Sequence, residues 1–447
     1  MMEIIQFVAG ALGDASYLVL SGDAAAVIDP QRDVRPYLAT AAERGASIRY
    51  VFETHVHNDY LSGGRELAAR GAEIVAPAES GLQFPHTAAS DGEEVTFGAA
   101  RLRAVAAPGH TYEHTAYLAI DEAGAIKGAF TGGAILMAAA GRSDLLGPDH
   151  TEELTRMQWQ TGRRIAAMLP PTAEILPTHG AGSFCSTTAT TGDRRAPLAT
   201  ELDRNPLFFG DSYESFRSLQ LASAAPIPGY YRHMAALNRS GPRVFGEPPH
   251  PALLTPAVLG EILAAGTNVV DTRTRFDHAT GHVPGALGIE DGGSFLAYAG
   301  WLLPFNAPLA LITYGSEPAE RLTTDLFRIG YEDVRGYLPF DEWQSRPLAA
   351  IPVVTQQEAA HILKSGALPV LDVRFAYEQD LEPLPGALRR TIDTFPTWAG
   401  TLGNERLLIV CASGERATMA ASLLQARGRD VIALAGGGAS DIRRILG

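Results

Sequence analysis

Short hydrophobic runs, many of them β-branched, alternate with helical patterns through the first 240 residues. Apolar runs bounded by glycine or polar clusters indicate buried strands, and apolar residues three and four positions apart indicate helices that cover a sheet. The alternation predicts a layered α/β fold. We expect strands at 17–20, 26–29, 48–52 and 73–76, the first two paired, and helices at 34–44 and 64–70.

The second half of the chain repeats itself. In each copy an apolar run leads into Asp-x-Arg, a Pro-Gly-Ala turn follows, and a second strand-like run precedes a helical pattern. Such a repeat indicates two α/β domains of about a hundred residues each. The matching segments are 270–273, 284–286 and 309–313 in the first copy, and 371–374, 385–387 and 407–410 in the second.

Composition marks the domain boundaries. Residues 240–251 are rich in proline and glycine, which is typical of a linker. Ile351 and Pro352 separate the two copies of the repeat. We therefore predict three domains, at 1–240, 252–348 and 352–447.

Charge and cysteine content narrow the function classes. The 447 residues carry a formal net charge of -14 and no Lys/Arg-rich run, which argues against nucleic acid or an anionic membrane surface as partner. The two cysteines, Cys185 and Cys411, give no disulfide framework and fit a reducing compartment. Neither a signal-peptide pattern nor an apolar run of the roughly 18 residues that span a membrane is evident, so we expect a cytoplasmic protein.

Three histidines indicate a metal site. His55 and His57 directly follow the strand-like run 48–52, and His110 lies in a glycine-containing loop. Imidazoles at the end of a strand project into one cavity, as a transition-metal site requires. We predict that His55, His57 and His110 are metal ligands.

Cys411 is a candidate nucleophile. It follows the apolar run 407–410 and opens a six-residue loop that ends at Arg416, just before a helical pattern. Loop amides, the positive end of a helix and the arginine all favour the thiolate, which is the reactive form of cysteine. The alternative is a small buried residue at a strand end.

With its repeat context, the segment 352–447 resembles a rhodanese domain. The resemblance rests on Asp372-Val373-Arg374, the Pro385-Gly386-Ala387 turn and the Cys411 loop. It implies that Cys411 carries a sulfane sulfur as a persulfide, with Arg416 beside it. Phosphatases of this fold class have a loop one residue longer, which makes phosphate chemistry the weaker interpretation.

The segment 252–348 resembles the same family through Asp271-Thr272-Arg273 and Gly281–Ala286. Tyr314 stands where the nucleophile would be. Because a phenol cannot form a persulfide, we expect this copy to be inactive and to serve in packing or docking.

Residues 1–240 resemble the metallo-β-lactamase superfamily, which implies an αβ/βα sandwich with a metal site. Asp59 and His179 would support the ligands or form the remnant of a second metal position, because Tyr60 replaces the histidine of binuclear zinc enzymes. Four motifs in the right order carry the resemblance: Thr54–Asp59, Pro108–Thr111, Phe130–Gly133 and Pro177–Gly180.

Two chemistries are known on this fold. Zinc hydrolases are one, and persulfide dioxygenases are the other. The dioxygenases hold one Fe(II) by two histidines and a carboxylate, and the resemblance implies that the two histidines are His55 and His110. Both branches have Asp at the position of Gly133, so this chain lacks the carboxylate. Three imidazoles suffice for Zn. For Fe(II), Asp59 or Asp144 would have to replace the lost ligand.

Two further residues belong to segments that resemble persulfide dioxygenases. Arg142, in Gly141–Asp144, would bind an anionic group of the thiol cofactor, and Cys185 would receive sulfur beside the metal cavity. The alternatives are a solvated arginine and an inert buried thiol.

Over nearly its whole length the chain resembles the bacterial persulfide dioxygenase–sulfurtransferase fusions. The resemblance implies oxidation of a low-molecular-weight persulfide to sulfite, coupled to sulfur transfer through Cys411. Thiol persulfide, thiosulfate and sulfite are the expected partners, and a homo-oligomer is compatible with the sequence. One alternative is a sulfurtransferase whose metal domain only binds persulfide; the other is a zinc-dependent thioester hydrolase.

Overall fold

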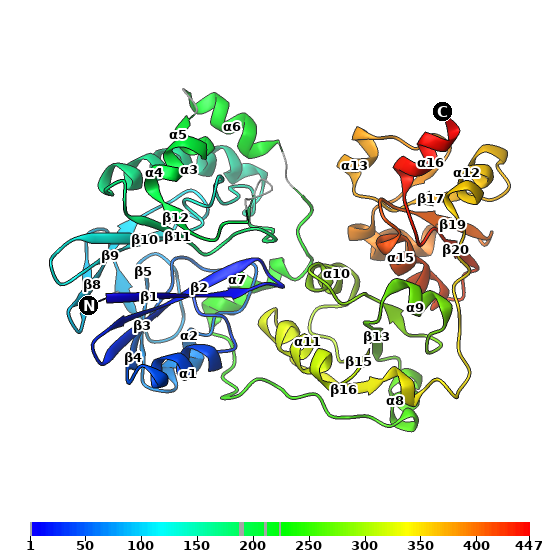
Figure 1. The fold of residues 1–447 in the computed structure, drawn as a ribbon, viewed down its shortest axis with the longest axis horizontal. Helices are drawn as coiled ribbons and strands as arrows, with labels where there is room; N and C mark the ends of the chain where they lie inside the picture. Colours follow the sequence, from blue (N-terminus) through cyan, green and yellow to red (C-terminus); the bar gives the residue numbers. More distant parts are fainter. Residues whose placement is uncertain (1, 187–191, 210–211, 223–224) are drawn as a thin grey trace. The chain divides into compact units, whose positions relative to one another are not determined.

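The computed structural model describes residues 2–186, 192–209, 212–222 and 225–447. The chain forms two compact units (Figure 1). The N-terminal unit comprises Met1–Ile227 and Tyr231–Pro248, and the C-terminal unit comprises Pro228–Tyr230 and Pro249–Gly447.

Two six-stranded sheets form the N-terminal unit. The first has the order β1 (Met2–Ala9), β2 (Asp14–Ser21), β3 (Ala24–Ile28), β4 (Ser47–Phe52), β5 (Glu73–Pro77), β6 (Thr87–Ala89). The second has the order β12 (Ala196–Pro197), β11 (Glu174–Pro177), β10 (Ile126–Gly132), β9 (Thr115–Ile120), β8 (Ala100–Ala106), β7 (Glu94–Phe97). Apolar side chains from both sheets, including Tyr17, Phe52 and Phe130, share one buried core, so the sheets pack face to face.

Helices cover the outer faces of this sandwich. Apolar residues of the first two helices, such as Tyr37 and Leu67, pack on the first sheet, and Ile165 of the third helix packs on the second. Figure 1 shows these helices on opposite sides of the two sheets, which is the αβ/βα arrangement. The helices are α1 (Arg35–Glu43), α2 (Gly64–Ala68), α3 (Pro148–Met168), α4 (Leu198–Arg204), α5 (Pro206–Phe209), α6 (Tyr213–Leu221) and α7 (Tyr231–Ser240).

The C-terminal unit contains two four-stranded parallel sheets of the same strand order. The first runs β14 (Leu287–Gly288), β13 (Asn268–Asp271), β15 (Leu309–Thr313), β16 (Val334–Pro339). The second runs β18 (Leu388–Arg389), β17 (Val370–Asp372), β19 (Leu407–Val410), β20 (Val431–Ala433). Their helices are α8 (Pro256–Ala264), α9 (Arg275–Thr280), α10 (Phe295–Leu302), α11 (Ser316–Arg328) and the 3-10 turn Phe340–Glu342 in the first copy, and α12 (Gln356–Ser365), α13 (Ala376–Leu381), α14 (Phe395–Trp398), α15 (Glu415–Gln425), α16 (Ala439–Leu446) and the 3-10 turns Ile392–Thr394 and Ala399–Thr401 in the second.

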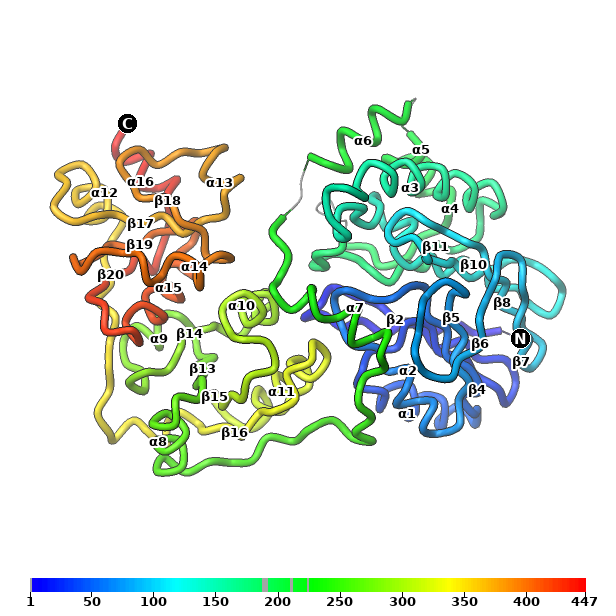
Figure 2. Tube along the Cα trace, turned by 180° about the vertical axis from the view of Figure 1, so that it is seen from behind, coloured from blue at the N-terminus to red at the C-terminus, as the bar shows by residue number. Residues whose placement is uncertain are grey.

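The two copies pack on each other within this unit. Both views place α15 of the second copy beside α9 of the first (Figures 1 and 2). The Gly288 N–H donates to Ser422 Oγ at 2.9 Å, and the Trp301 ring meets the Phe375 ring edge-on at 5.4 Å between centroids. The first copy therefore contributes a helix, α10, to the surroundings of the second.

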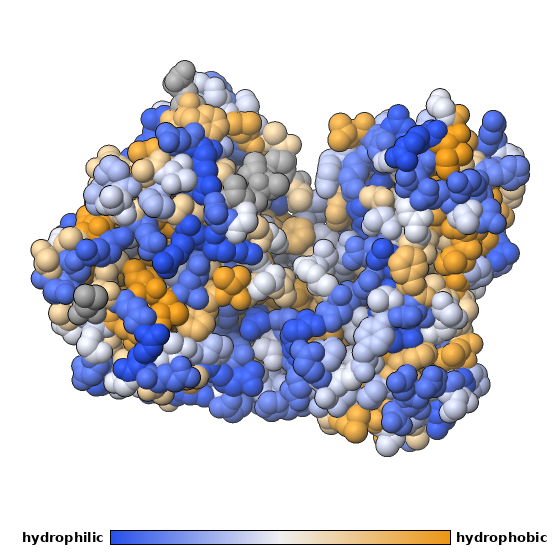
Figure 3. Space-filling model, viewed as in Figure 1, coloured by the Kyte–Doolittle hydropathy of each residue, from blue (hydrophilic) through white to orange (hydrophobic). Residues whose placement is uncertain are grey.

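The predicted α/β class is confirmed, and so are the predicted strands and helices, within a few residues at each end. The pairing of the first two predicted strands is antiparallel, between β2 and β3. The last strand, β20, ends at Ala433, and three consecutive glycines from Gly436 onward favour a loop after it. None of the described helices is both long and apolar enough to span a membrane. On the face in Figure 3, hydrophilic and hydrophobic residues are intermixed.

Candidate metal and sulfur sites

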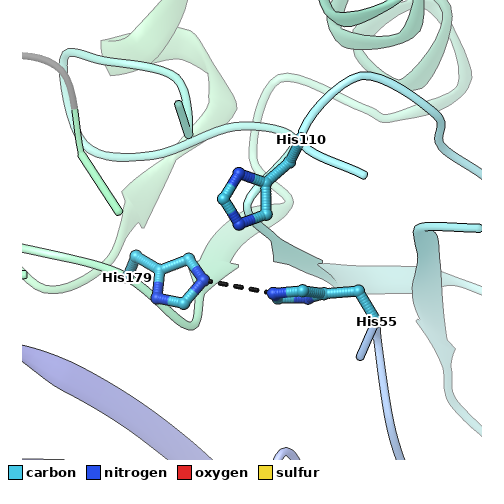
Figure 4. A group of neighbouring side chains, drawn as sticks. All are labelled: His55, His110 and His179. Carbon is cyan, nitrogen blue, oxygen red and sulfur yellow. Dashed lines mark hydrogen bonds between the residues drawn. The ribbon is translucent and has the colours of Figure 1, made fainter. Parts of the chain in front are cut away.

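Three histidines from three loops of the N-terminal unit converge on one point (Figure 4). His55 follows β4, His110 lies between β8 and β9, and His179 follows β11. One ring nitrogen of each lies within 4.8 Å of those of the other two, and the Nε2 atoms of His55 and His179 are 3.3 Å apart. All three side chains are buried. The structure thus groups His179, rather than His57, with His55 and His110.

His57 belongs to neighbouring groups of ligand atoms. It forms one with Asp59 and His179 and another with Asp29 and Glu53. Its Nε2 lies 3.2 Å from Asp29 Oδ1 and 3.6 Å from Glu53 Oε2, while its Nδ1 is buried without a hydrogen-bond partner among the described residues. His179 belongs both to the group with His55 and His110 and to the group with His57 and Asp59, so it links these two groups.

A buried carboxylate ties the loops together. Asp29 Oδ1 accepts the Thr54 N–H at 2.7 Å, and Asp29 Oδ2 accepts the hydroxyls of Thr54 and Thr178. Each threonine immediately precedes a histidine of the cluster, His55 or His179. One side chain at the end of β3 thereby fixes two loops from two different sheets.

Burial and neighbouring charges shift the pKa values of the residues around the cluster in opposite directions. Burial disfavours charge on His179, but Asp59 and Asp14 outweigh it and raise its pKa to about 9. Burial and the charge of His179 lower the pKa of His110 to about 3, so this ring is neutral. Burial and the neighbouring Asp59 raise the pKa of Asp14 to about 7.

The residues fit a divalent transition-metal ion. The His110 Nδ1–H donates to the Arg142 carbonyl at 2.6 Å, which leaves the Nε2 lone pair free, and this Nε2 is buried with no hydrogen-bond partner among the residues described. Unpartnered ring nitrogens facing other imidazoles and a carboxylate are costly unless an ion satisfies them. His55, His110 and His179, with Asp59 beside them, would hold it.

Gly133 is not an empty ligand position. A Cβ atom built on it would lie 2.5 Å from Cγ and Cδ2 of His110. Its N–H donates to His114 Nε2 at 2.9 Å, and its carbonyl accepts from Gly141 and Gln158. The His110 ring therefore packs where the aspartate side chain of the related enzymes would start.

Tyr60 closes the other side of the site. Its buried ring stacks on His57 with centroids 4.4 Å apart. Its hydroxyl lies 3.0 Å from His57 Nε2 and donates to the Asp29 carbonyl at 3.2 Å. The phenol therefore contacts His57 by both its ring and its hydroxyl.

Arg142 and Asp144 are engaged with each other. Two N–H groups of the guanidinium donate to the Asp144 carboxylate at 2.8 and 2.6 Å, and a third donates to the Ala225 carbonyl at 2.6 Å. This pairing keeps Asp144 out of the histidine cluster and occupies the guanidinium that was expected to bind an anion.

Cys185 is buried on the Asp59 side of the cluster. Burial and the charges of Asp59 and Asp14 raise the pKa of its thiol well above the usual value. Its Sγ lies 3.9 Å from the Tyr231 hydroxyl. Cys185 is therefore a buried thiol near the acidic residues Asp14 and Asp59.

A cavity leads to the cluster from the α2 side. It is narrow, with a volume of about 20 Å³, and its lining includes Glu53, His55 and His57. Its walls are mostly apolar, with Ile74, Pro77, Leu82, Phe84 and Pro242 among the lining residues.

Cys411 in the C-terminal unit begins its loop as predicted, directly after β19. It is fully buried, and the Gly414 N–H donates to its Sγ at 3.1 Å. Arg416 lies in the first turn of α15 and bonds the Glu378 carboxylate at 2.5 and 2.8 Å. The Cys411 loop thus supplies an amide donor to the sulfur and leads directly into the N-terminus of α15.

Tyr314 occupies the corresponding place in the first copy, directly after β15. Its hydroxyl donates to Asp277 and accepts the Thr274 N–H at 3.0 Å. The side chain is 58% exposed and turns toward solvent, unlike Cys411.

Several residues of the metal site carry no motif in the sequence. Asp14, Asp29, Glu53 and His114 were not singled out, although all are buried around the cluster. For Asp29 the sequence contains one signal, since this residue ends a predicted strand and precedes a proline. In the structure it adopts a φ of 49°. Asp14 begins β2, far away in sequence, and only the strand arrangement brings it to His179.

Two family models match parts of this chain. Residues 9–192 match the metallo-beta-lactamase superfamily and residues 355–440 match the rhodanese-like domain family. A hydroxyacylglutathione hydrolase of Acidiphilium cryptum is 34% identical over 113 residues, covering 25% of this chain and 46% of the relative. The chain thus spans about half the length of such curated relatives.

Solved structures resemble the chain over longer stretches. A crystal structure described as a metallo-beta-lactamase from Staphylococcus aureus is 27% identical, covers 76% of this chain and 99% of its own, and has a TM-score of 0.67. ETHE1 from Myxococcus xanthus is 25% identical over 53% of this chain and 98% of its own, with a TM-score of 0.45. The protein therefore contains a metallo-β-lactamase-fold domain and a rhodanese-like domain, a combination that fits an enzyme of sulfur metabolism.

Proposed function

We propose that the protein oxidises a low-molecular-weight persulfide to sulfite at the histidine cluster and moves sulfane sulfur through Cys411. One observation carries the proposal: a buried histidine cluster with unpartnered ring nitrogens and a buried thiol aligned with a helix N-terminus occur in the same chain. The first is suited to a redox metal and the second to a persulfide.

Asp59 supplies the carboxylate that Gly133 cannot. It is buried, and its Oδ2 lies 3.1 Å from the His179 ring. The contact is to His179 Nδ1, and Asp59 forms with His57 and His179 a group of ligand atoms that adjoins the group of His55, His110 and His179. In the proposed set Asp59 adds one carboxylate to these three imidazoles. When bound there, Fe(II) would supply coordination positions for oxygen and for the substrate sulfur.

The protein's own groups orient this set. The Arg142 carbonyl holds the His110 ring, Asp14 accepts from His179 Nδ1 at 2.9 Å, and Thr54 Oγ1 lies 2.9 Å from His55 Nδ1. Such partners fix the tautomer and direction of each ligand. The apolar walls of the cavity keep bulk water from the persulfide.

Sulfur transfer proceeds at Cys411 without a metal. The thiolate attacks the terminal sulfur of a persulfide RS–SH, the S–S bond breaks, and RS⁻ leaves with the electron pair while Cys411 retains the sulfur as Cys–S–SH. A thiol acceptor reverses the step. Placing transfer and oxidation in one chain raises the effective concentration of a labile persulfide. Cys185 would be a second sulfur acceptor beside the metal ligands.

The experiment is oxygen uptake by Fe(II)-loaded protein supplied with glutathione persulfide or coenzyme A persulfide, with sulfite as product. Asp59→Asn should lower uptake at least about tenfold and reduce bound iron per chain, because it removes the only carboxylate of the set. Asp149→Asn, an exposed carboxylate in α3, is the matched control and should change neither. Iron content that is equal in the parent and Asp59→Asn would contradict the ligand assignment.

Absence of oxygen uptake by iron-loaded parent protein would contradict the oxidation proposal. The remaining function would then be sulfur transfer, with a metal domain that only binds persulfide; the His110 ring against Gly133 favours this second candidate. Gly133→Asp is a poor test of it, because the new side chain would displace His110.

The hydrolase named in the comparisons is a third candidate, supported by the identity to hydroxyacylglutathione hydrolase. Tyr60 disfavours it, since it stands in place of a ligand for a second zinc. Zinc-dependent cleavage of a glutathione thioester by the purified protein would revive it.

A further inference from the structure

The cation of the Cys411 loop is already neutralised. Arg416 donates two hydrogen bonds to the two oxygens of Glu378, at 2.5 and 2.8 Å, and only 9% of its side chain is exposed. Its guanidinium carbon lies 4.8 Å from the centre of the Phe375 ring. A bidentate pair on an aromatic face leaves few donors of this guanidinium for a substrate.

The loop contains no other positive charge. Between Cys411 and Arg416 it has Ala412, Ser413, Gly414 and then the acidic Glu415. The two copies close around it, because Phe375 meets Trp301 of the first copy edge-on. The surroundings of Cys411 therefore contain backbone donors and aromatic side chains, but the loop itself has no positively charged side chain that is free of a carboxylate partner.

This matters for the leaving group of sulfur transfer. From thiosulfate, the Cys411 thiolate takes the outer sulfur, the S–S bond breaks and sulfite leaves as a dianion, with Cys–S–S⁻ remaining. From a persulfide RS–SH, the leaving thiolate carries one negative charge and its carbon chain can contact apolar surface. A dianion without a cationic partner in a buried site is costly.

We infer that Glu378 is a specificity-determining residue which, by occupying Arg416, makes the Cys411 loop select persulfide donors and thiol acceptors over thiosulfate and sulfite. The inference rests on the proposed role of Cys411 as sulfur carrier and names its substrate class. The selectivity applies to sulfur transfer onto Cys411 and away from it, because sulfite is a dianion both as the leaving group from thiosulfate and as the acceptor in the reverse step.

Glu378→Gln tests this in the full chain. The amide still has an oxygen that can accept the Phe375 N–H, which Glu378 accepts at 3.0 Å at the start of α13. We expect kcat/KM for thiosulfate, with a thiol acceptor, to rise about tenfold, as one charged hydrogen-bond partner is freed. The value for glutathione persulfide should change by less than about twofold.

Two further variants separate specificity from structure. Asp277→Asn alters the matching carboxylate of the first copy and should leave both donors unchanged. Glu378→Gln combined with Arg416→Ala should lose the gain with thiosulfate, because the gain requires the freed guanidinium. A Glu378→Gln protein in which both donors rise or fall together would overturn the inference.

The failure of the proposed function would look different. If Cys411→Ser transferred sulfur as well as the parent, Cys411 would not be the carrier, and the donor preference of Glu378→Gln would have no site to act on. If Cys411→Ser is inactive and the parent uses thiosulfate at least as well as persulfide, only the selectivity is wrong.

Discussion

The two copies in the C-terminal unit share a frame and differ in their loops. In both, the Asp-x-Arg segment at the end of a strand forms a buried ion pair: Asp271 with Arg273 and Asp372 with Arg374, each with a contact of 2.7 Å. In both, the arginine also bonds a backbone carbonyl eight residues ahead, that of Gly281 or Glu382. The repeat thus preserves what holds the fold.

The loops after the next strand diverge. After Cys411 the helix begins at Glu415, whereas after Tyr314 it begins at Ser316, so the first copy has a shorter loop before its helix. Gly414 adopts a φ of 94°, and a Cβ there would lie 2.0 Å from the Ala435 carbonyl oxygen. Only glycine permits the turn that aims its N–H at Cys411.

A carboxylate survives in both copies and has a different partner in each. Glu378 pairs with Arg416, while Asp277 accepts from the Tyr314 hydroxyl. The comparison teaches that the first copy has lost the thiol, the loop amides and the cation together, yet keeps its core. It packs on the second copy through α10 and the Gly288 contact with Ser422.

The largest effect should come from exchanging the nucleophiles. Cys411→Ser should lower sulfur transfer at least about a thousandfold, because a hydroxyl cannot carry the persulfide. Tyr314→Cys should not restore it in the Cys411→Ser background, because its loop lacks the amide donor and the arginine. The measurement is sulfur transfer from glutathione persulfide to a thiol. Activity in the double variant near that of the parent would show that a thiol alone suffices.

The next largest effect should come from breaking the buried Asp-Arg ion pair that both copies share, and it should be a loss of stability. Asp372→Ala leaves the Arg374 guanidinium buried without its carboxylate, which should destabilise the second copy by roughly 3–5 kcal/mol. The readout is hydrogen exchange of peptides covering β17 and β19. Asp430→Ala is the control, since its pair with Arg406 is exposed and should contribute about 0–1 kcal/mol. Equal protection losses in the two variants would refute the role of burial.

A smaller effect should appear in acid at the Asp271–Arg273 pair of the first copy. Burial disfavours the Asp271 carboxylate, but hydrogen bonds from His278 and Arg273 outweigh it and lower its pKa to about 2. A folded-state pKa below the unfolded value of about 3.9 contributes stability above pH 4 that is lost as pH falls toward 2; here it amounts to about 2 kcal/mol.

Hydrogen exchange of the β13 peptide, measured between pH 5 and pH 2.5, checks this. The free energy of opening should fall over that interval in the parent and stay nearly level in Asp271→Asn, which carries no titrating group there. The same slope in both proteins would place the titration elsewhere.

Much of the fold was predictable because it is encoded in local patterns. The apolar runs that became β2 to β5 are flanked by turn residues, and the repeat announced two domains of like topology. The Cys411 loop was equally local, since its strand, glycine and helix start are consecutive in the chain. Such features need only neighbouring residues to specify them.

The metal site required the folded chain. Asp14, Asp29 and His179 are separated by up to 165 positions and meet only because the start of β2 and the ends of β3 and β11 lie at the same edge of the sandwich. The sequence predicts His57 as a ligand because it lies two residues from His55, whereas in the structure its Nε2 faces Asp29 and His179 joins His55 and His110.

Gly133 shows the same division. Its identity indicates a missing carboxylate, but that the His110 ring fills the space depends on packing between loops. A site formed by consecutive residues, such as the Cys411 loop, can be predicted from the sequence. A site assembled from distant loops is determined by the register and packing of the strands that carry them.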